Sequence, residues 1–270
     1  MLHGPDPKVT PFATDSAPPV RGYIHFPSVV ADASVPPTTD YRLPTAHRRQ
    51  AVVLSHGAGS NCNAPLLVAL ARAFAAAGLT VLRCDLPYRQ KRPHGPPLGS
   101  AAEDQQGLRN AVMALKNLTP ERPLGRIYLG GHSYGGRQAT MLAATDACVA
   151  DGLLLLSYPL HPPKKPEQLR TAHFPKVRTP AMFVHGSRDP FGSLEEMKSA
   201  LQLIPAVTFL MTVEGAGHDL SLKASRPAAP SSPSGPSGPS RPTDSLHQQN
   251  ADYLPGKVVT AFCQWSASLG

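Results

Sequence analysis

The sequence predicts an α/β fold in which a mostly parallel central sheet is flanked by helices. From residue 50 onward, short apolar runs alternate with longer segments whose apolar residues recur at helical spacing, which is typical of β-α-β units. A chain of 270 residues can also bury one large core without a disulfide or metal to hold it. The four cysteines also indicate neither a disulfide framework nor a metal site, because they are scattered without a C-x-x-C pair or metal-ligand spacing.

Six apolar runs and the segments between them define the predicted elements. Asn63 is the expected N-cap of the first helix, which Gly78 ends, and residues 100–103 form an expected capping box for the second. Further helices should begin directly after HSYGG and near Ser193, and a last one should span residues 253–266. The six strands are predicted at residues 51–54, 79–83, 126–129, 152–157, 181–184 and 207–211, with an antiparallel edge strand at 21–26.

The expected domain organisation is a flexible segment at residues 1–20 followed by a single domain at 21–270. One composition break interrupts that domain at residues 224–245, which are almost entirely Ser, Pro and Gly. Such a segment has too few apolar side chains to offset the entropy of ordering it. It is therefore predicted to be a disordered insertion in a surface loop before the last helix.

Charge and hydropathy bear on the class of partner. The net charge is +8, but the basic residues fall in short groups without interleaved aromatics, so a solvated surface is favoured over nucleic-acid binding. No apolar run approaches the length of a membrane span, and the first twenty residues lack a signal-peptide pattern. We therefore expect a cytoplasmic protein with no membrane partner, no metal site and no cofactor. The sequence does not indicate an oligomeric state.

The stretch GHSYG places Ser133 at the centre of a G-x-S-x-G motif. The motif follows a predicted strand and opens a predicted helix, which is the context of a nucleophile elbow. Small residues two positions before and after the serine let a tight turn project its hydroxyl without backbone clashes. Ser133 is therefore the candidate nucleophile.

A serine hydroxyl needs a base, and the base needs a carboxylate to orient it. Asp189 follows the predicted strand at residues 181–184, and His218 lies in a glycine-rich loop after the next strand. The chain order Ser133, Asp189, His218 is the order found in the α/β-hydrolases. Asp219 and Glu214 are weaker candidates for the acid, because a sequence neighbour would have to fold back to reach the imidazole.

The loop LSHGAGSN, residues 54–61, is the candidate oxyanion loop. It follows the first parallel strand, where a backbone N–H is expected from Ala58, and the second donor is expected from the backbone of Tyr134. Gly57 and Gly59 are interpreted as residues that let this loop approach the serine. Several basic residues follow predicted strands on the same side of the sheet as the candidate site: Arg89, Lys91, Arg92, Lys164 and Lys165. We interpret them as solvated loop charges; the less favoured alternative is that they select an anionic acyl group.

The chain resembles the α/β-hydrolase superfamily, in particular its dienelactone-hydrolase-like branch with the testis-expressed and NSL-complex-subunit type of domain. The segments SHGAG, DLPYRQKRP, GGHSYGGR, SYPLHPPKKPEQLR, HGSRDPFG and GAGHDL carry this resemblance. It implies an α/β-hydrolase fold without a separate cap domain, in agreement with the short link between residues 160 and 180. The dienelactone hydrolases use a cysteine where this chain has Ser133, so their substrate is not carried over.

The function predicted from these motifs is that of a serine esterase acting on a small-molecule acyl substrate through an acyl-enzyme intermediate. In this hypothesis Ser133 attacks, His218 moves the proton and Asp189 orients the imidazole. Two alternatives stay open at this point. One is a binding or scaffold protein that retains the fold without turnover, and the other is a small peptidase of the same fold.

Overall fold

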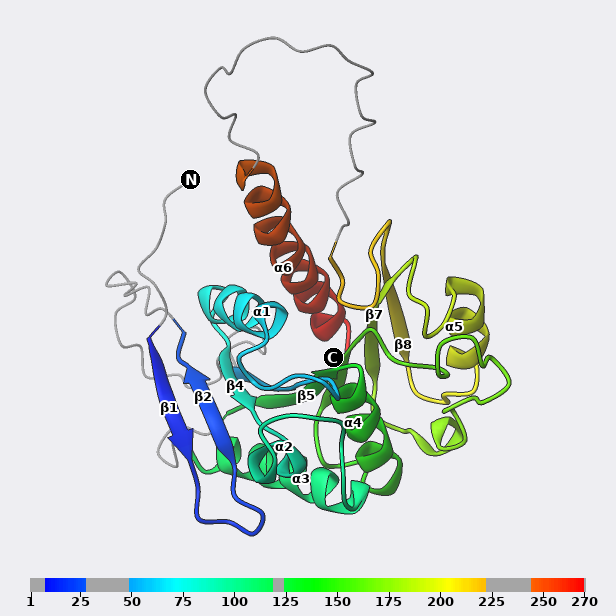
Figure 1. Cartoon of the computed structure of the whole chain (residues 1–270). Helices are drawn as coiled ribbons and strands as arrows, with labels where there is room; N and C mark the ends of the chain where they lie inside the picture. Colours follow the sequence, from blue (N-terminus) through cyan, green and yellow to red (C-terminus); the bar gives the residue numbers. More distant parts are fainter. Residues whose placement is uncertain (1–7, 28–48, 119–123, 222–243, 270) are drawn as a thin grey trace.

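An eight-stranded sheet forms the centre of the protein (Figure 1). The structure, a computed structural model, describes residues 8–27, 49–118, 124–221 and 244–269. The sheet order is β1-β2-β4-β3-β5-β6-β7-β8; β2 pairs antiparallel with β1 and β4, and all other neighbours are parallel. The strands are β1 (Val9–Ala13), β2 (Arg21–His25), β3 (Gln50–Ser55), β4 (Thr80–Cys84), β5 (Arg126–His132), β6 (Gly152–Leu156), β7 (Ala181–Gly186) and β8 (Thr208–Val213).

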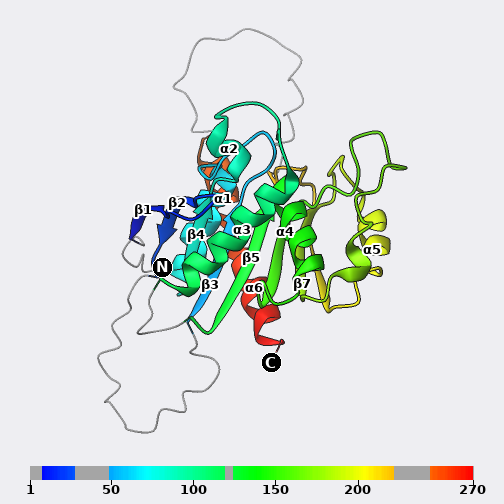
Figure 2. The same cartoon turned by 90° about the horizontal axis from the view of Figure 1, so that it is seen from below.

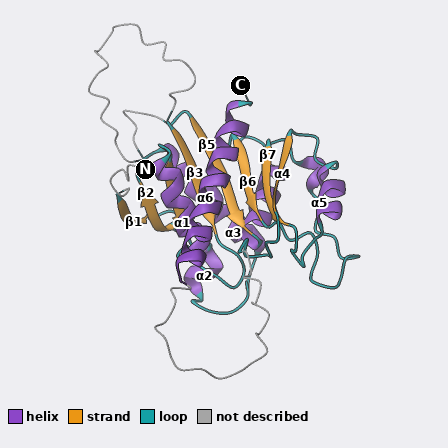
Figure 3. Cartoon of the chain, turned by 90° about the horizontal axis from the view of Figure 1, so that it is seen from above, coloured by secondary structure: helices purple, strands orange, loops and turns teal. Residues whose placement is uncertain are grey.

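Helices cover both faces of the sheet, and each face has its own apolar core. Helices α3, α4 and α5 lie on one face, as Figure 2 shows, and α1 and α6 lie on the other, as Figure 3 shows. The buried side chains of each set pack against the strands to form the two cores. Because the central parallel strands are covered on both sides, β4, β6 and β7 are buried along their whole length. The helices are α1 (Pro65–Ala76), α2 (Pro87–Lys91), α3 (Ala101–Lys116), α4 (Tyr134–Thr145), α5 (Leu194–Leu201) and α6 (Asp244–Ala267).

The helix starts differ in detail from the expected caps. Ala64, not Asn63, occupies the N-cap of α1, and no side chain caps this helix, whose first residue is Pro65. Pro65 has no N–H to satisfy, so the start needs less help from a cap. At α3 the Ser100 side chain accepts a hydrogen bond from Ala102 N, as a cap should. The expected capping box is not completed there, since the Glu103 carboxylate binds Lys91 instead.

The N-terminal region departs from the expectation for residues 1–20. Residues 9–13 form β1, which pairs with β2, so β1 and not β2 is the edge strand at this end of the sheet. Pro11 lies within β1, and an edge strand tolerates a residue that cannot donate to a ladder. Helix α2 was not predicted. The Ser/Pro/Gly-rich segment at 224–245 lies outside the described residues except for its last two, which begin α6.

No cap domain interrupts the described sheet. The link between β6 and β7 is fully described, and its regular structure is a 3-10 helix at Phe174–Lys176. The carboxyl ends of the parallel strands are therefore free of an inserted domain. Among the described helices, none is both long and apolar enough to cross a membrane.

Candidate active site

Ser133 stands at the tight turn between β5 and α4. Its backbone angles are φ 50° and ψ −112°, a conformation that costs a non-glycine residue about 1–3 kcal/mol. The flanking glycines make the turn possible. A Cβ on Gly131 would lie 2.8 Å from the carbonyl carbon of Gly135, and a Cβ on Gly135 would lie 2.7 Å from His56 O. The elbow predicted from G-x-S-x-G is therefore formed, and its glycines are sterically required.

An unbroken chain of hydrogen bonds runs from Ser133 to Asp189. His218 Nε2 lies 2.8 Å from Ser133 Oγ, and His218 Nδ1 lies 2.8 and 3.0 Å from the two carboxylate oxygens of Asp189. A carboxylate only accepts, so the imidazole proton belongs on Nδ1. Nε2 is then left to accept the hydroxyl proton of Ser133. The three residues predicted from their chain order meet at one point.

Two loops deliver the carboxylate and the imidazole, and they are hydrogen-bonded to each other. The loop after β7 carries Asp189 and the loop after β8 carries His218. Arg188 N donates to Ala216 O at 2.9 Å. A Cβ on Gly186, at the end of β7, would collide with the same carbonyl oxygen. The absence of a side chain at Gly186 therefore lets the two loops approach closely enough for Arg188 N to donate to Ala216 O.

Two further contacts hold His218, one on its imidazole ring and one on its backbone carbonyl. Phe191 stacks on it with ring centroids 4.0 Å apart and an angle of 29° between the planes. His132 Nε2 lies 2.8 Å from His218 O, and because that oxygen only accepts, the contact places a proton on Nε2. Burial lowers the pKa of His132, so this ring is neutral near pH 7. Neither ring was predicted to have a role.

The weaker acid candidates are engaged elsewhere. The Glu214 carboxylate accepts from Ser187 Oγ at 2.8 Å. The Asp219 carboxylate accepts from Ser221 Oγ at 2.7 Å and from its N–H at 3.1 Å. Of the three acids considered, Asp189 is the one hydrogen-bonded to His218.

The loop after β3 passes beside Ser133. A Cβ on Gly57 would lie 3.5 Å from Ser133 Cβ, and Ser60 N donates to Gly57 O at 3.1 Å, which closes a turn around Ala58. Within the described residues, neither Ala58 N nor Tyr134 N donates to a protein acceptor. Neither predicted donor is therefore committed to another described group.

The two glycines of that loop are not equivalent. A Cβ on Gly57 would lie 3.0 Å from His132 Nδ1, whereas a Cβ on Gly59 would meet nothing within 4 Å. The interpretation that both glycines permit close approach is right for Gly57 and wrong for Gly59. Of the two glycines, Gly57 is the one that lies against the elbow residues His132 and Ser133.

The suggestion that basic loop residues select an anionic acyl group fails for two of them. Arg89 is only 5% exposed, and its guanidinium donates to backbone carbonyls. Lys91 Nζ lies 2.6 and 2.7 Å from the two carboxylate oxygens of Glu103. The other three side chains are exposed: Arg92, Lys164 and Lys165.

A cavity of about 910 Å³ lies beside this site rather than within it. Its described lining comes from α1, α6, the end of β8 and the residues that follow β8. The lining reaches Gly57 and His132 but includes neither Ser133 nor His218. We therefore do not assign it as the place where a substrate meets Ser133.

Comparison with known proteins places this chain in a family. The family model of an alpha/beta hydrolase domain matches residues 48–231. Dienelactone hydrolase from Anabaena variabilis is a similar solved structure, at 16% identity and TM-score 0.63, covering 95% of this chain and 98% of that chain. Est1E from Butyrivibrio proteoclasticus is 15% identical, with TM-score 0.63 and coverage of 95% and 99%.

A serine hydrolase without a lid from Xanthomonas campestris is also similar, at 14% identity and TM-score 0.56, covering 98% of this chain and 97% of that chain. Identities this low show the fold alone. The fold is therefore the expected α/β-hydrolase fold without a cap domain, and its structural neighbours are dienelactone-hydrolase-like. The family model extends over more than half of the 270 residues and includes the elbow and both loops that meet it. The chain belongs to the alpha/beta hydrolase domain family.

Proposed function

We propose that the protein is a serine esterase that cleaves a small ester or related acyl compound through an acyl-enzyme intermediate. The observation that carries the proposal is the hydrogen-bonded chain from Ser133 through His218 to Asp189 at a strained elbow. Strain of this kind is retained where function requires it. The alpha/beta hydrolase fold supports a hydrolase, and the residues at the elbow support this particular chemistry.

In the first half-reaction, Ser133 Oγ attacks the carbonyl carbon while His218 Nε2 takes the hydroxyl proton. The carbonyl oxygen becomes an oxyanion and accepts from the N–H groups of Ala58 and Tyr134. The bond to the leaving alcohol then breaks, and the proton on Nε2 passes to the departing oxygen. An ester between Ser133 and the acyl group is left on the enzyme.

In the second half-reaction, a water molecule takes the place of the alcohol. His218 removes its proton as the water oxygen attacks the acyl carbon, and the proton then returns to Ser133 as the free acid leaves. Proton transfer by a positioned imidazole contributes about 10²- to 10⁴-fold to the rate. Each backbone donor to the oxyanion contributes about 3 kcal/mol.

The strained serine favours this function over a binding or scaffold role, because φ 50° and ψ −112° place its hydroxyl 2.8 Å from His218 Nε2, an alignment that a binding role does not need. No described contact specifically favours the peptidase alternative. The segments DLPYRQ and SYPLHPP support a relation to the testis-expressed and NSL-complex-subunit type, which stays a prediction. The cytoplasmic location and the lack of nucleic-acid and membrane partners also stay predictions.

Labelling with a fluorophosphonate probe, together with hydrolysis of a short-chain nitrophenyl ester, tests the proposal. The wild type should be labelled and should turn over the ester, and Ser133→Ala should do neither. Ser199→Ala is the matched control, because the Ser199 hydroxyl is exposed and donates within its own helix. A wild type that neither reacts with the probe nor hydrolyses the ester would contradict the proposal that the protein is a serine esterase. Cleavage of a peptide anilide at a rate similar to the ester would favour the peptidase.

A further inference from the structure

The orientation of one peptide unit decides whether the loop after β3 can stabilise an oxyanion. The carbonyl of Gly57 and the N–H of Ala58 belong to the same peptide group, which is planar and trans. The two bonds therefore point in opposite directions. Whatever holds Gly57 O on one side also directs the Ala58 N–H to the other.

Gly57 O is held by donors from three places. His56 Nδ1 lies 2.9 Å away, Ser60 N lies 3.1 Å away and Tyr88 Oη lies 3.2 Å away. The His56 ring is fixed in turn, because Leu86 N donates to its Nε2 at 3.1 Å. Nε2 must then be unprotonated and Nδ1 must carry the proton. The 3.6 Å approach of Asp85 to Nε2 is therefore no ion pair.

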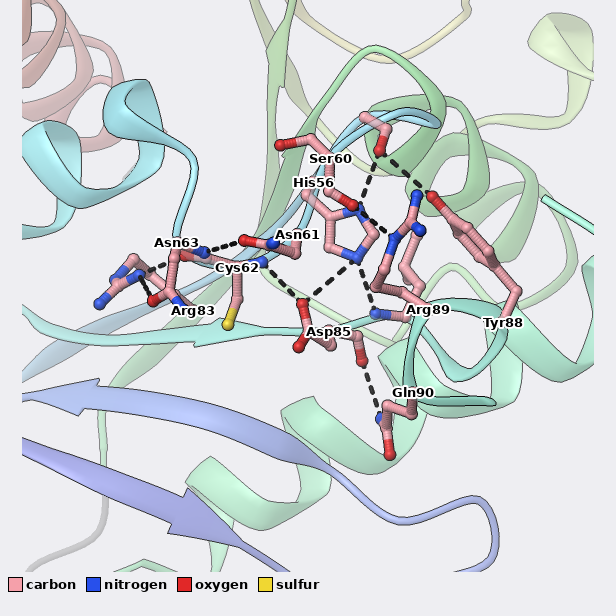
Figure 4. A network of polar contacts seen from close by, with 12 residues as sticks. His56, Ser60, Asn61, Cys62, Asn63, Arg83, Asp85, Tyr88, Arg89 and Gln90 are labelled. Atoms are coloured by element: carbon pink, nitrogen blue, oxygen red, sulfur yellow. Dashed lines mark hydrogen bonds and ion pairs between the residues drawn. The ribbon is translucent and has the colours of Figure 1, made fainter. Parts of the chain in front are cut away.

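The next peptide of the turn is held through Ala58 O. Tyr88 Oη donates to it at 2.8 Å and Arg89 Nη2 at 2.8 Å, while Arg89 Nε donates to Ser60 O at 2.7 Å. The single proton of the Tyr88 hydroxyl is shared between Ala58 O and the more distant Gly57 O. Figure 4 shows this network, in which the side chains of α2 reach the loop after β3.

Helix α2 is itself fastened to the elbow. Asp104 Oδ1 accepts from Tyr88 N at 3.1 Å, and Asp104 Oδ2 accepts from the Tyr134 hydroxyl at 2.7 Å. The rings of Tyr88 and Tyr134 meet edge to face at 5.6 Å. Burial raises the pKa of Tyr88 to about 12, so its hydroxyl retains the proton that it donates. The loop, α2 and the elbow therefore form one hydrogen-bonded assembly.

Arg89 is notable because it is a buried cation whose described hydrogen-bond acceptors are all backbone carbonyls, and its guanidinium also lies 5.0 Å from the centre of the Tyr88 ring. Besides Ala58 O and Ser60 O it donates to Arg92 O at 3.1 Å and to Gly95 O at 3.0 Å. A planar guanidinium can bridge several carbonyls in fixed directions, which an ammonium group cannot do. Its geometry suits it to holding a turn in one conformation.

We propose that Tyr88 and Arg89 are positioning residues that hold the Gly57–Ala58 peptide with its N–H directed toward the oxyanion formed at Ser133. The inference rests on the proposed function, because it assigns these side chains to the esterase reaction. They touch neither the substrate nor the reacting atoms and act through the backbone of the loop. Preorganised donors of this kind need no reorganisation as charge develops.

Tyr88→Phe removes the hydroxyl that binds the two carbonyls but retains the ring. Arg89→Lys retains the positive charge but loses the planar guanidinium that bridges several carbonyls. Each should lower kcat for a nitrophenyl ester by about 10- to 100-fold, below the 10²- to 10³-fold cost of losing a donor outright. KM should change by less than about threefold. Affinity for a trifluoromethyl ketone, whose adduct with the serine carries an oxyanion, should fall by the same factor as kcat/KM.

Tyr158→Phe is the matched control, since its buried hydroxyl also donates to a backbone carbonyl, Arg170 O at 2.8 Å, away from the loop. It should lose similar thermal stability yet retain kcat. The pH dependence of kcat/KM should be the same in all folded variants. If either Tyr88→Phe or Arg89→Lys fails to fold, the other variant still tests the positioning role.

Two kinds of failure are distinguishable. A wild type without ester turnover or probe labelling would reject the proposed function and this inference together. An active wild type whose Tyr88→Phe and Arg89→Lys variants retain kcat and inhibitor affinity would reject the positioning role alone. The same conclusion would follow if the variants lost no more activity than Tyr158→Phe.

Discussion

His218 Nδ1 lies 2.8 Å from Asp189 Oδ2, although the two residues are 29 positions apart in the chain. The carboxylate side chain is fully buried, and its other oxygen also accepts from Phe191 N at 2.9 Å. These contacts hold the carboxylate in one orientation. Because the acceptor is fixed before any substrate arrives, the imidazole is kept in the tautomer that leaves Nε2 free for Ser133.

Replacing Asp189 by Asn should abolish most of the activity without removing the serine or the histidine. The amide presents a donor where the carboxylate presents only acceptors, so the imidazole loses the partner that selects its tautomer. We expect kcat for a nitrophenyl ester to fall by about 10³- to 10⁴-fold, as in other enzymes with this arrangement. Circular dichroism would show that the variant is folded.

Glu214→Gln and Asp219→Asn are the matched controls for that substitution. Each changes a carboxylate to an amide in the loop that carries His218, but the two side chains bind Ser187 and Ser221 instead. Both variants should retain kcat within about threefold. A loss in either one as large as that of Asp189→Asn would mean that the acid has been misassigned.

Gly186→Ala tests how close the two loops must be. The added methyl group would lie 2.6 Å from Gly217 O, so the His218 loop must move away from the loop that carries Asp189. A displacement of this kind should lower kcat by roughly 10- to 100-fold. Steady-state ester hydrolysis measures it. Unchanged kcat would show that the loops tolerate separation.

Gly256→Ala should stabilise the protein. This glycine is exposed within α6, and a Cβ built on it meets nothing within 4 Å. Alanine restricts the unfolded chain and favours the helix, so the free energy of unfolding should rise by about 0.5–1 kcal/mol. Urea unfolding followed by circular dichroism provides the measurement, and activity should stay at the wild-type level. A decrease in stability would contradict the open surroundings of this residue.

Stability should fall as the pH is lowered from about 6.5 to about 4, in part because of His25. Its Nε2 accepts from Arg83 Nε at 2.8 Å, so the folded protein requires an unprotonated ring. Burial, with the neighbouring Arg83, lowers the pKa of His25 from 6.5 to about 4. Between these values the unfolded chain binds a proton that the folded protein does not, and the free energy of unfolding decreases.

Urea unfolding at several pH values between 7.5 and 4.5 measures that slope. His25→Gln offers an amide oxygen to the same guanidinium without a titrating group, so its stability should depend less steeply on pH over this interval. An identical slope in the wild type and His25→Gln would show that His25 does not contribute.

Much of the fold followed from local pattern. The six apolar runs became six strands. Five of them lie inside the sheet and are covered by helices on both faces, so they must be apolar along most of their length, whereas β8 forms an edge of the sheet and is partly exposed. The opposite edge was harder to predict. β1 is short, contains Pro11 and is exposed at every second residue, so its sequence resembles a loop until a partner strand is known. Helix α2, five residues long, is too short to show a period.

The sequence by itself determined which residues are chemically able to form the site. The spacing of glycines around Ser133 and the order in which Asp189 and His218 follow it are local facts about the chain, and they suffice to name the candidates. Distances between loops are not local. Whether Asp189, Asp219 or Glu214 faces His218 depends on how β7 and β8 pair and on the space that Gly186 leaves between their loops.

The same holds for the roles of Tyr88 and Arg89, which look like ordinary members of a basic, aromatic stretch. Only the tertiary structure places their side chains against the carbonyls of the loop after β3, because β4 lies beside β3 in the sheet and leads directly into α2. Chemical identity is a property of each residue, whereas the direction of an N–H bond depends on every group that holds its peptide.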